Sequence, residues 1–206
     1  DESGEIEIAN KEQAGGILAE LQNEEFIVGP VKKGRRSRQP APPFITSTMQ
    51  QEASKRLGFQ AYRTMRAAQE LYEGVDIEGQ GAVGLITYMR TDSLRISEDA
   101  IREAGEFIDG RWGGKYLPPK PRRYKSRAGA QDGHEAIRPS TISLTPEKVM
   151  SSLTPDQYKL YKLIWERFIA SQMANCVLNT TQANILAGDY IFKASGFNVA
   201  FEGFTA

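Results

Sequence analysis

The sequence is poor in the residues that build metal centres and disulfide frameworks, with one cysteine and one histidine among 206 residues. A single cysteine, Cys176, excludes an intrachain disulfide framework and a cysteine-rich zinc site. It also favours a reducing, cytoplasmic setting. A single histidine, His134, excludes a site built from several histidines. No apolar run approaches the roughly 20 residues that a transmembrane helix needs, so we expect no membrane span.

The chain also lacks net charge, because 26 Lys and Arg residues balance 26 Asp and Glu residues. Nucleic-acid-binding proteins usually carry excess positive charge, so a nucleic-acid partner would have to be recognised through local clusters. Hydrophobic residues at 40% and charged residues at 25% are ordinary for a globular protein. The chain starts at Asp1 without a signal segment and stops after strand-like sequence. We therefore expect it to be a piece of a larger protein. We also expect it to be a monomer.

Hydrophobic patterning predicts a multi-domain α+β chain. Residues 1–39 are expected to form a strand-rich domain, residues 40–174 a mainly helical domain, and residues 175–206 a return to the strand-rich domain. The helical domain would thus be inserted into the strand-rich one. The expected strands are 5–8, 26–28, 83–88, 178–186, 190–194 and 197–201. Three expected helices start after a capping residue: one after Asn10, one after Ser47 or Thr48, and one after Ser97. Another helix is expected at 61–72, and a further one from Pro155.

Three stretches are expected to be irregular. Residues 32–43 combine a basic run with three prolines and predict a linker or an exposed crossing between domains. Residues 74–82 predict a glycine-rich loop, and residues 110–133 predict a long loop. The glycines match neither a P-loop nor a dinucleotide fingerprint, so no nucleotide site is expected.

Residues 84–93 (GLITYMRTDS) hold the densest cluster of chemically useful side chains. A tyrosine and an arginine two positions apart on extended backbone point to the same side. A guanidinium beside Tyr88 favours the phenolate and stabilises charge on a phosphoryl group. Thr91 offers a hydroxyl donor, and Asp92 can hold Arg90 through a bidentate pair. The cluster predicts attack of Tyr88 on a phosphodiester, although the spacing alone more commonly produces a packed tyrosine beside a surface arginine.

Two further clusters fit phosphate contacts. His134 and Arg138 lie four residues apart and can both donate to a phosphate, or His134 can simply pack locally. Residues 120–127 interleave basic side chains with an aromatic, which suits single-stranded nucleic acid or a solvated charge run. Gln69 and Glu73, one helical turn apart, can face a phosphate site or solvent.

Four motifs together resemble the bacterial type IA DNA topoisomerase I family: residues 42–51 (PPFITSTMQQ), 53–59 (ASKRLGF), 84–93 and 134–140 (HEAIRPS). Their order and spacing match as well as their residues, and the resemblance covers essentially the whole chain. The methionine after Tyr88 favours topoisomerase I over topoisomerase III, in which a proline is usual.

The resemblance implies an isomerase that cleaves and rejoins single-stranded DNA without ATP and relaxes negative supercoils. Tyr88 would become linked to the 5′ phosphate and release a 3′ hydroxyl. Arg90 would stabilise the transition state, and His134 would contact the scissile-site phosphate. The implied supporting residues are Thr87, Thr91, Asp92, Gln69 and Glu73, and the expected DNA contacts are Arg122, Arg123, Tyr124, Lys125 and Arg138.

The same resemblance implies that this chain holds part of an enzyme. Residues 40–174 correspond to the family's helical domain III, and residues 1–39 and 175–206 to its arch-like domain II. The Mg²⁺ site belongs to a Toprim domain, and much of the single-strand groove belongs to another domain of the parent chain. We therefore expect no metal site here, and no activity of this chain alone.

Two other functions fit some of the same residues. A tyrosine recombinase also uses Tyr, Arg and His on a DNA phosphate, but there the pattern is His-x-x-Arg followed by the tyrosine, whereas here Tyr88 comes first. A binding module without catalysis could grip single-stranded DNA through residues 120–127. Adduct polarity separates the first alternative from a topoisomerase, and salt-dependent binding tests the second.

Overall fold

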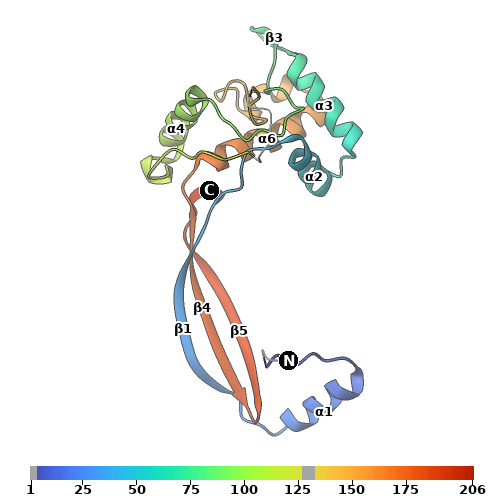
Figure 1. Ribbon diagram of the computed structural model, residues 1–206, viewed down its shortest axis with the longest axis vertical. Coiled ribbons are helices and arrows are strands. Elements are labelled where there is room, and N and C mark those ends of the chain that lie inside the picture. The colour runs from blue at the N-terminus through green and yellow to red at the C-terminus, as the bar shows by residue number, and fades with distance from the viewer. Residues whose placement is uncertain (1–3, 127–132) are drawn as a thin grey trace. The chain divides into compact units, whose positions relative to one another are not determined.

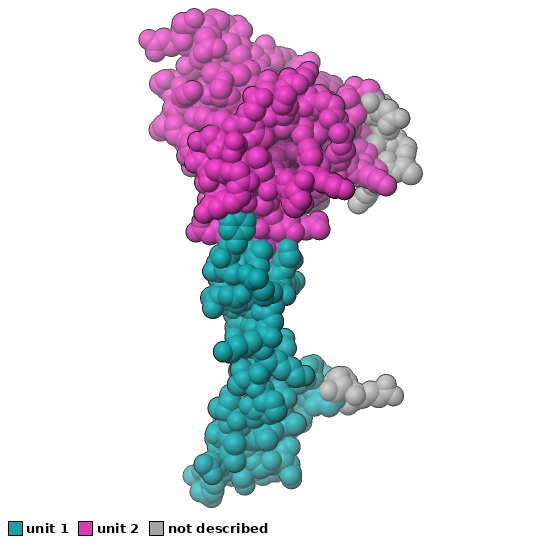
Figure 2. Space-filling model, turned by 90° about the vertical axis from the view of Figure 1, so that its left-hand side faces the viewer, with its two compact units in different colours: residues 1–37, 177–201 teal, residues 38–176, 202–206 magenta. Residues whose placement is uncertain are grey.

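Figure 1 shows the computed structural model, which describes residues 4–126 and 133–206. Helices and strands occupy different stretches of the chain, and the predicted α+β class is confirmed. The chain divides into two compact units, coloured separately in Figure 2. Unit 1 comprises Asp1–Ser37 and Val177–Phe201, and unit 2 comprises Arg38–Cys176 and Glu202–Ala206. Unit 2 therefore interrupts the sequence of unit 1.

The bounds of the helices and strands are as follows. The helices are α1 (Lys11–Leu21), α2 (Thr46–Leu57), α3 (Ala61–Glu73), α4 (Glu98–Trp112), α5 (Pro146–Val149) and α6 (Pro155–Gln172). The strands are β1 (Ile27–Arg38), β2 (Val75–Ile77), β3 (Gly81–Val83), β4 (Cys176–Ala187) and β5 (Tyr190–Phe201). Within residues 4–126 and 133–206, no helix is both long and apolar enough to cross a membrane.

Unit 1 is built on a three-stranded sheet in the order β1-β4-β5 (Figure 1). Strands β4 and β5 form a long antiparallel hairpin in which Thr180 faces Phe197 and Ala187 faces Tyr190. The turn contains Gly188, whose φ of +53° lies in the left-handed region that favours glycine. The predicted break between strands 190–194 and 197–201 is wrong, because Ser195 and Gly196 both pair with β4 and β5 runs through them.

The predicted linker at residues 32–43 is also partly wrong. Its basic half is strand, since β1 extends to Arg38 and lies beside β4. A Cβ added at Gly34 would come within 3.1 Å of the Thr180 hydroxyl, which shows how closely the two strands approach. Residues 5–8, in contrast, form no strand, and Ile6 and Ile8 are more than half exposed.

The core of unit 2 surrounds α6. A capping box between Thr154 and Gln157, with proline at the first helical position, starts this helix as predicted. Its Tyr161 hydroxyl donates to the Leu144 carbonyl at 2.6 Å, and its Trp165 ring nitrogen donates to the Ile142 carbonyl at 3.1 Å. These bonds attach the segment that follows residue 140 to the most buried helix of the unit.

The helices around this core agree with the predictions, but two short segments do not. Ser97 caps α4 as expected, and α2 begins at Thr46, one or two residues before the expected caps. The glycine-rich stretch at 74–82 is not a loop, because β2 and β3 form a small hairpin in it. Residues 83–88 form no strand beyond Val83, and a single bridge joins Ile86 to Pro139.

Candidate active site

The segment around Tyr88 alternates between solvent and core although it is not part of a sheet. The exposed members are Tyr88, Arg90 and Asp92, and the buried members are Met89, Thr91 and Ser93. Tyr88 retains 39% of its surface, whereas Met89 is completely buried. The buried side chains anchor the segment, so the phenol and the guanidinium are presented on its exposed side.

Thr46, at the start of α2, holds the backbone on both sides of Arg90. Its hydroxyl donates to the Met89 carbonyl at 2.7 Å and accepts from the Thr91 N–H at 2.9 Å. The Thr46 N–H donates to the Thr91 carbonyl, also at 2.9 Å. The sequence analysis did not single out Thr46, and the only signal for it was its place in the 42–51 motif.

Thr87 joins the tyrosine segment to the histidine segment. Its hydroxyl donates to the Ala136 carbonyl at 2.7 Å and accepts from the Arg138 N–H at 3.0 Å. Its own N–H donates to the Arg138 carbonyl at 2.9 Å. This pairing places the ring of His134 edge-on to the ring of Tyr88, with 5.5 Å between centroids and 87° between planes.

The last turn of α3 approaches Tyr88 from another direction. Tyr72 packs edge-on against Tyr88 with a centroid distance of 5.4 Å. The Leu85 N–H donates to the Leu71 carbonyl at 2.7 Å, which ties the tyrosine segment to the helix end. A Cβ at Gly84 would lie 2.7 Å from the Tyr72 carbonyl oxygen, so this approach requires glycine. Tyr88 is thus held between two rings from distant segments.

Gln69 and Glu73 lie on the same helical turn as Tyr72. The Gln69 amide nitrogen donates to a Glu73 carboxylate oxygen, and Glu73 is exposed. Their side chains therefore bond to each other near the tyrosine. Their supporting role stays a prediction.

The expected pair between Arg90 and Asp92 is wrong. Both side chains are exposed, and within the part of the chain that the structure describes neither forms an ion pair. Their alternate positions put them on one side of the segment, but each faces solvent separately. The Arg90 guanidinium is therefore open to an anion.

His134 and Arg138 are not equivalent as phosphate donors. Residues 134–140 are not helical, so the two side chains do not share a helical face. Arg138 is 13% exposed and forms two hydrogen bonds to one oxygen of Glu135, at 3.0 and 2.7 Å. Another of its nitrogens donates to the Pro139 carbonyl at 2.9 Å. Arg138 therefore stabilises its own segment, while the His134 ring contacts Tyr88.

The basic segment at 120–127 is largely committed to contacts within unit 2. Arg122 donates to the Met173 carbonyl at 2.8 Å, and Arg123 forms a bidentate pair with Glu98. Tyr124 donates to the Ser171 carbonyl at 2.8 Å, and burial raises the pKa of its phenol. Lys125 is exposed, with no ion pair to any residue that the structure describes. Arg127 lies outside the described residues.

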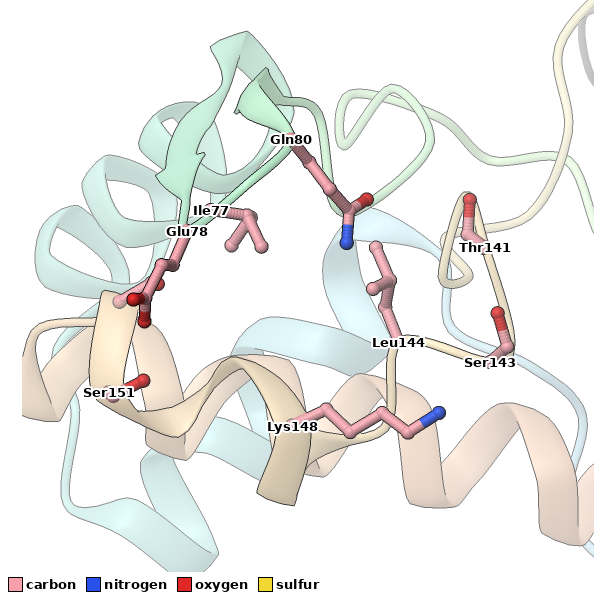
Figure 3. A pocket seen from close by; sticks show the side chains of 9 residues that line it. Ile77, Glu78, Gln80, Thr141, Ser143, Leu144, Lys148 and Ser151 are labelled. Atoms are coloured by element: carbon pink, nitrogen blue, oxygen red, sulfur yellow. The ribbon is translucent and has the colours of Figure 1, made fainter.

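Tyr88 lines neither of two cavities found among the described residues of unit 2. Figure 3 shows one of about 420 Å³ between the β2–β3 hairpin and the segment that ends at residue 152. Gln80, Ser143 and Lys148 are among its lining side chains, and it contains none of the predicted site residues. Another cavity, of about 580 Å³, includes Asp92 in its wall. The site around Tyr88 is therefore an exposed surface rather than a closed pocket.

The described residues provide no metal centre of their own. Across residues 4–126 and 133–206 there is no group of three or more His, Cys, Asp or Glu side chains that could hold a metal ion. The described side chains thus form no site for Mg²⁺, which the family resemblance assigns to another domain of the parent chain. No step of the chemistry is assigned to a metal here.

Comparison with known proteins gives consistent matches. The sequence model of a family described as DNA topoisomerase matches residues 1–206. Proteins named DNA topoisomerase 1 from Rickettsia felis, Rickettsia typhi and Rickettsia prowazekii are each 48% identical over 200 residues. These alignments cover 96% of this chain and 26% of each relative.

A solved structure is similar over nearly the whole chain. Full-length topoisomerase I from Thermotoga maritima superposes with a TM-score of 0.82 at 37% identity, covering 98% of this chain and 32% of that one. The chain thus spans between about a quarter and a third of the length of the proteins that it matches.

Proposed function

The chain belongs to the DNA topoisomerase family, and from that premise we propose that it carries the nucleophile of a type IA enzyme that relaxes negatively supercoiled DNA without ATP. In this proposal residues 40–174 are the tyrosine-bearing domain III, and residues 1–39 and 175–206 are parts of domain II. The Toprim and groove domains would come from the rest of the parent protein.

One observation carries the proposal. Tyr88 is 39% exposed, contacts the His134 ring at 5.5 Å between centroids, and shares the exposed side of its segment with Arg90. A phenol, an imidazole and a guanidinium with no ion pair among the described residues form a surface that suits a phosphodiester. Buried residues and backbone hydrogen bonds fix both segments, so the arrangement exists before DNA binds.

The proposed step is a transesterification. The Tyr88 oxygen forms a bond to phosphorus as the bond from phosphorus to the 3′ oxygen of the neighbouring sugar breaks. The phenol loses its proton, and the leaving 3′ oxygen takes up a proton to become a hydroxyl. The product is a 5′-phosphotyrosine ester, and the reverse step reseals the strand with no net change in bond types. This balance explains why no ATP is needed.

Arg90 and His134 would act on the phosphate. The Arg90 guanidinium would donate to the non-bridging oxygens as negative charge builds on them. His134, whose ring contacts Tyr88, would donate to the same phosphate. Thr87 and Thr91 would not contact the phosphate. They would help to position Tyr88, Arg90 and His134 through the hydrogen bonds that fix the neighbouring backbone. Arg138 would reach DNA only by exchanging Glu135 for a phosphate.

Covalent capture in the full-length parent tests the nucleophile. Tyr88→Phe removes one hydroxyl and keeps both ring contacts, so folding should persist while covalent DNA adducts disappear. Tyr72→Phe is the matched control, because it removes a neighbouring hydroxyl and should leave capture intact. An adduct that survives in Tyr88→Phe, or that vanishes in Tyr72→Phe, would contradict the assignment.

The recombinase alternative has less support. Every match named above is a topoisomerase, and Tyr88 precedes the histidine segment rather than following it. A recombinase would leave the protein on the 3′ phosphate. The polarity of the trapped adduct therefore separates the two functions independently of the mutants.

A further inference from the structure

The sheet of unit 1 contains no acidic residue in any of its three strands. Strands β1, β4 and β5 together carry six basic side chains and neither Asp nor Glu. Five of the six lie in seven consecutive residues of β1, which is named here the basic strip: Lys32, Lys33, Arg35, Arg36 and Arg38. This concentration stands out because the chain as a whole has zero net charge.

All five side chains of the basic strip are exposed. None of them forms an ion pair with another residue in the part of the chain that the structure describes. Clustered cations of one sign repel one another, so their placement along one strand raises the energy of the free protein. An anionic partner would relieve that repulsion.

The acidic residues of unit 1 lie elsewhere. The sixth basic residue of the sheet, Lys193, pairs with Glu5 at 3.5 Å, and the Tyr190 hydroxyl donates to Glu20 at 2.6 Å. Both contacts are near the β4–β5 turn. Gly34 of the basic strip lies against Thr180, well along β4 from that turn. Unit 1 is therefore acidic toward the turn and α1, and basic along the other half of β1.

Neutral polar side chains border the basic strip. Thr180 and Gln182 lie on β4, the strand next to β1, and Asn179 hydrogen-bonds to Asn198 across the hairpin at 3.1 Å. Hydroxyl and amide groups of this kind contact phosphate and sugar oxygens in nucleic-acid complexes. Phe197, opposite Thr180, is 67% exposed and provides an aromatic face.

We propose that the basic strip, with the adjoining polar half of β4, binds the phosphate backbone of DNA at a site separate from Tyr88. The inference rests on the proposed function only in taking DNA as the polyanion. Seven residues of strand extend over about 20 Å, a length of duplex that carries about a dozen phosphate charges. Five lysine and arginine side chains on such a strand match an extended row of phosphates better than a single small anion.

The test measures non-covalent binding in the full-length parent carrying Tyr88→Phe. Arg35→Gln with Arg36→Gln removes two charges from the basic strip. Lys11→Gln with Lys193→Gln removes two charges from the acidic half of the same unit and is the matched control. Affinity for duplex and single-stranded DNA is measured between about 0.05 and 0.3 M salt, the range in which phosphate contacts change affinity steeply.

The strip variant should bind at least about tenfold more weakly near 0.1 M salt, and its plot of log affinity against log salt should be shallower by about 1.8 for duplex or 1.4 for single strands. The control should match the parent. Whichever DNA form shows the change identifies the bound backbone. Unchanged affinity and slope, or an equal loss in the control, would overturn the proposal.

A photo-cross-link provides a second measurement that does not depend on the double variant folding. Benzoylphenylalanine at Lys33 should cross-link to DNA, and the same group at Lys11 should not. No cross-link at Lys33 in a protein that binds DNA would overturn the proposal. A covalent DNA adduct in the Tyr88→Phe background would contradict the nucleophile assignment, but the binding result would remain readable.

Discussion

At the residue scale, Tyr88 owes its position to side chains that do no chemistry. Thr87 fixes the neighbouring histidine segment, Gly84 allows α3 to approach, and Met89 fills the core directly beneath. Each of these three residues restricts the conformational freedom of the proposed reactive groups, which would otherwise be lost only when DNA binds. Preorganisation of this kind lowers the barrier by holding reacting groups in place.

Thr46 provides a test of that idea in the full-length parent. Thr46→Val removes the hydroxyl that bonds to Met89 and Thr91, so the Arg90 backbone can shift. A misplacement of about 1 Å can cost about 100-fold in rate, and we expect strand cleavage to slow by about 10- to 100-fold. Single-turnover cleavage of an oligonucleotide measures the change.

Two controls accompany this variant. Thr46→Ser keeps the hydroxyl and should restore cleavage. Thr48→Val removes a neighbouring hydroxyl that bonds only within the start of α2, and it should cleave normally. Normal cleavage by Thr46→Val, or a loss explained entirely by weaker DNA binding, would show that the Thr46 bonds do not position Arg90.

At the element scale, an ion pair fastens α3 to the first turn of α6. Arg63 forms two hydrogen bonds to Asp156, both at 2.6 Å. The Arg63 guanidinium holds the pKa of the Asp156 carboxyl below its ordinary value. The Asp156 carboxyl therefore binds a proton more readily in the unfolded chain than in the folded one. As a result, the pair stabilises the fold at pH values above the ordinary carboxyl pKa.

This linkage predicts an acid-sensitive contribution to stability. As pH falls below about 4 toward the lowered pKa of Asp156, protonation should remove the stabilisation by the pair. Asp156→Asn should lose that part of the pH dependence while remaining folded at pH 7. The effect should be small and should shrink in high salt, because the Arg63 side chain is 52% exposed and the Asp156 side chain is 35% exposed. Urea midpoints across the acid range measure it, and a variant with the unchanged acid profile would refute it.

The sequence predicts those elements whose signals are local. Asn10, Ser97 and Pro155 mark helix starts because a cap acts on residues within one turn. The basic run of β1 is misread as a linker because its strand partner, β4, lies far along the chain. The continuity of β5 is missed for a different reason. Its residues 195–196 look like a turn locally, and pairing with Thr181 and Gln182 of β4 holds them in the strand.

The site divides in the same way. The alternation that exposes Tyr88 and Arg90 follows from extended backbone and can be predicted locally. The neighbours of Tyr88 cannot, because Tyr72 and His134 arrive through the Leu71 and Thr87 hydrogen bonds to distant segments. The motif of His134 was recognisable as part of a family pattern, whereas Tyr72 lies in none of the four motifs, and the contacts of both residues depend on the tertiary structure.

At the scale of the whole molecule, the proposed reactive residues lie in one unit, and most of the basic strip lies in the other. Unit 2 carries Tyr88, Arg90 and His134, while unit 1 carries the basic strip except for Arg38 and has no predicted catalytic residue. The chain covers 26% of its Rickettsia relatives, so domains of the parent are expected to complete the site around the exposed phenol.

This division predicts that the 206-residue chain alone does not relax negatively supercoiled plasmid, even with Mg²⁺ present. The reason is that the described residues include the proposed nucleophile but no cluster for a metal ion. Gel assays with the full-length parent as the positive control measure relaxation. Efficient relaxation by the chain alone would show that its own residues suffice.

The central claim is that the Tyr88 oxygen bonds to a DNA 5′ phosphate. Trapping the parent on a single-stranded oligonucleotide, digesting it and sequencing the nucleotide-bearing peptide by mass spectrometry tests this claim most directly. We predict a 5′-phosphate ester on Tyr88 and a free 3′ hydroxyl on the released strand. An ester on Tyr72 or any other residue, or a linkage to a 3′ phosphate, would contradict the account.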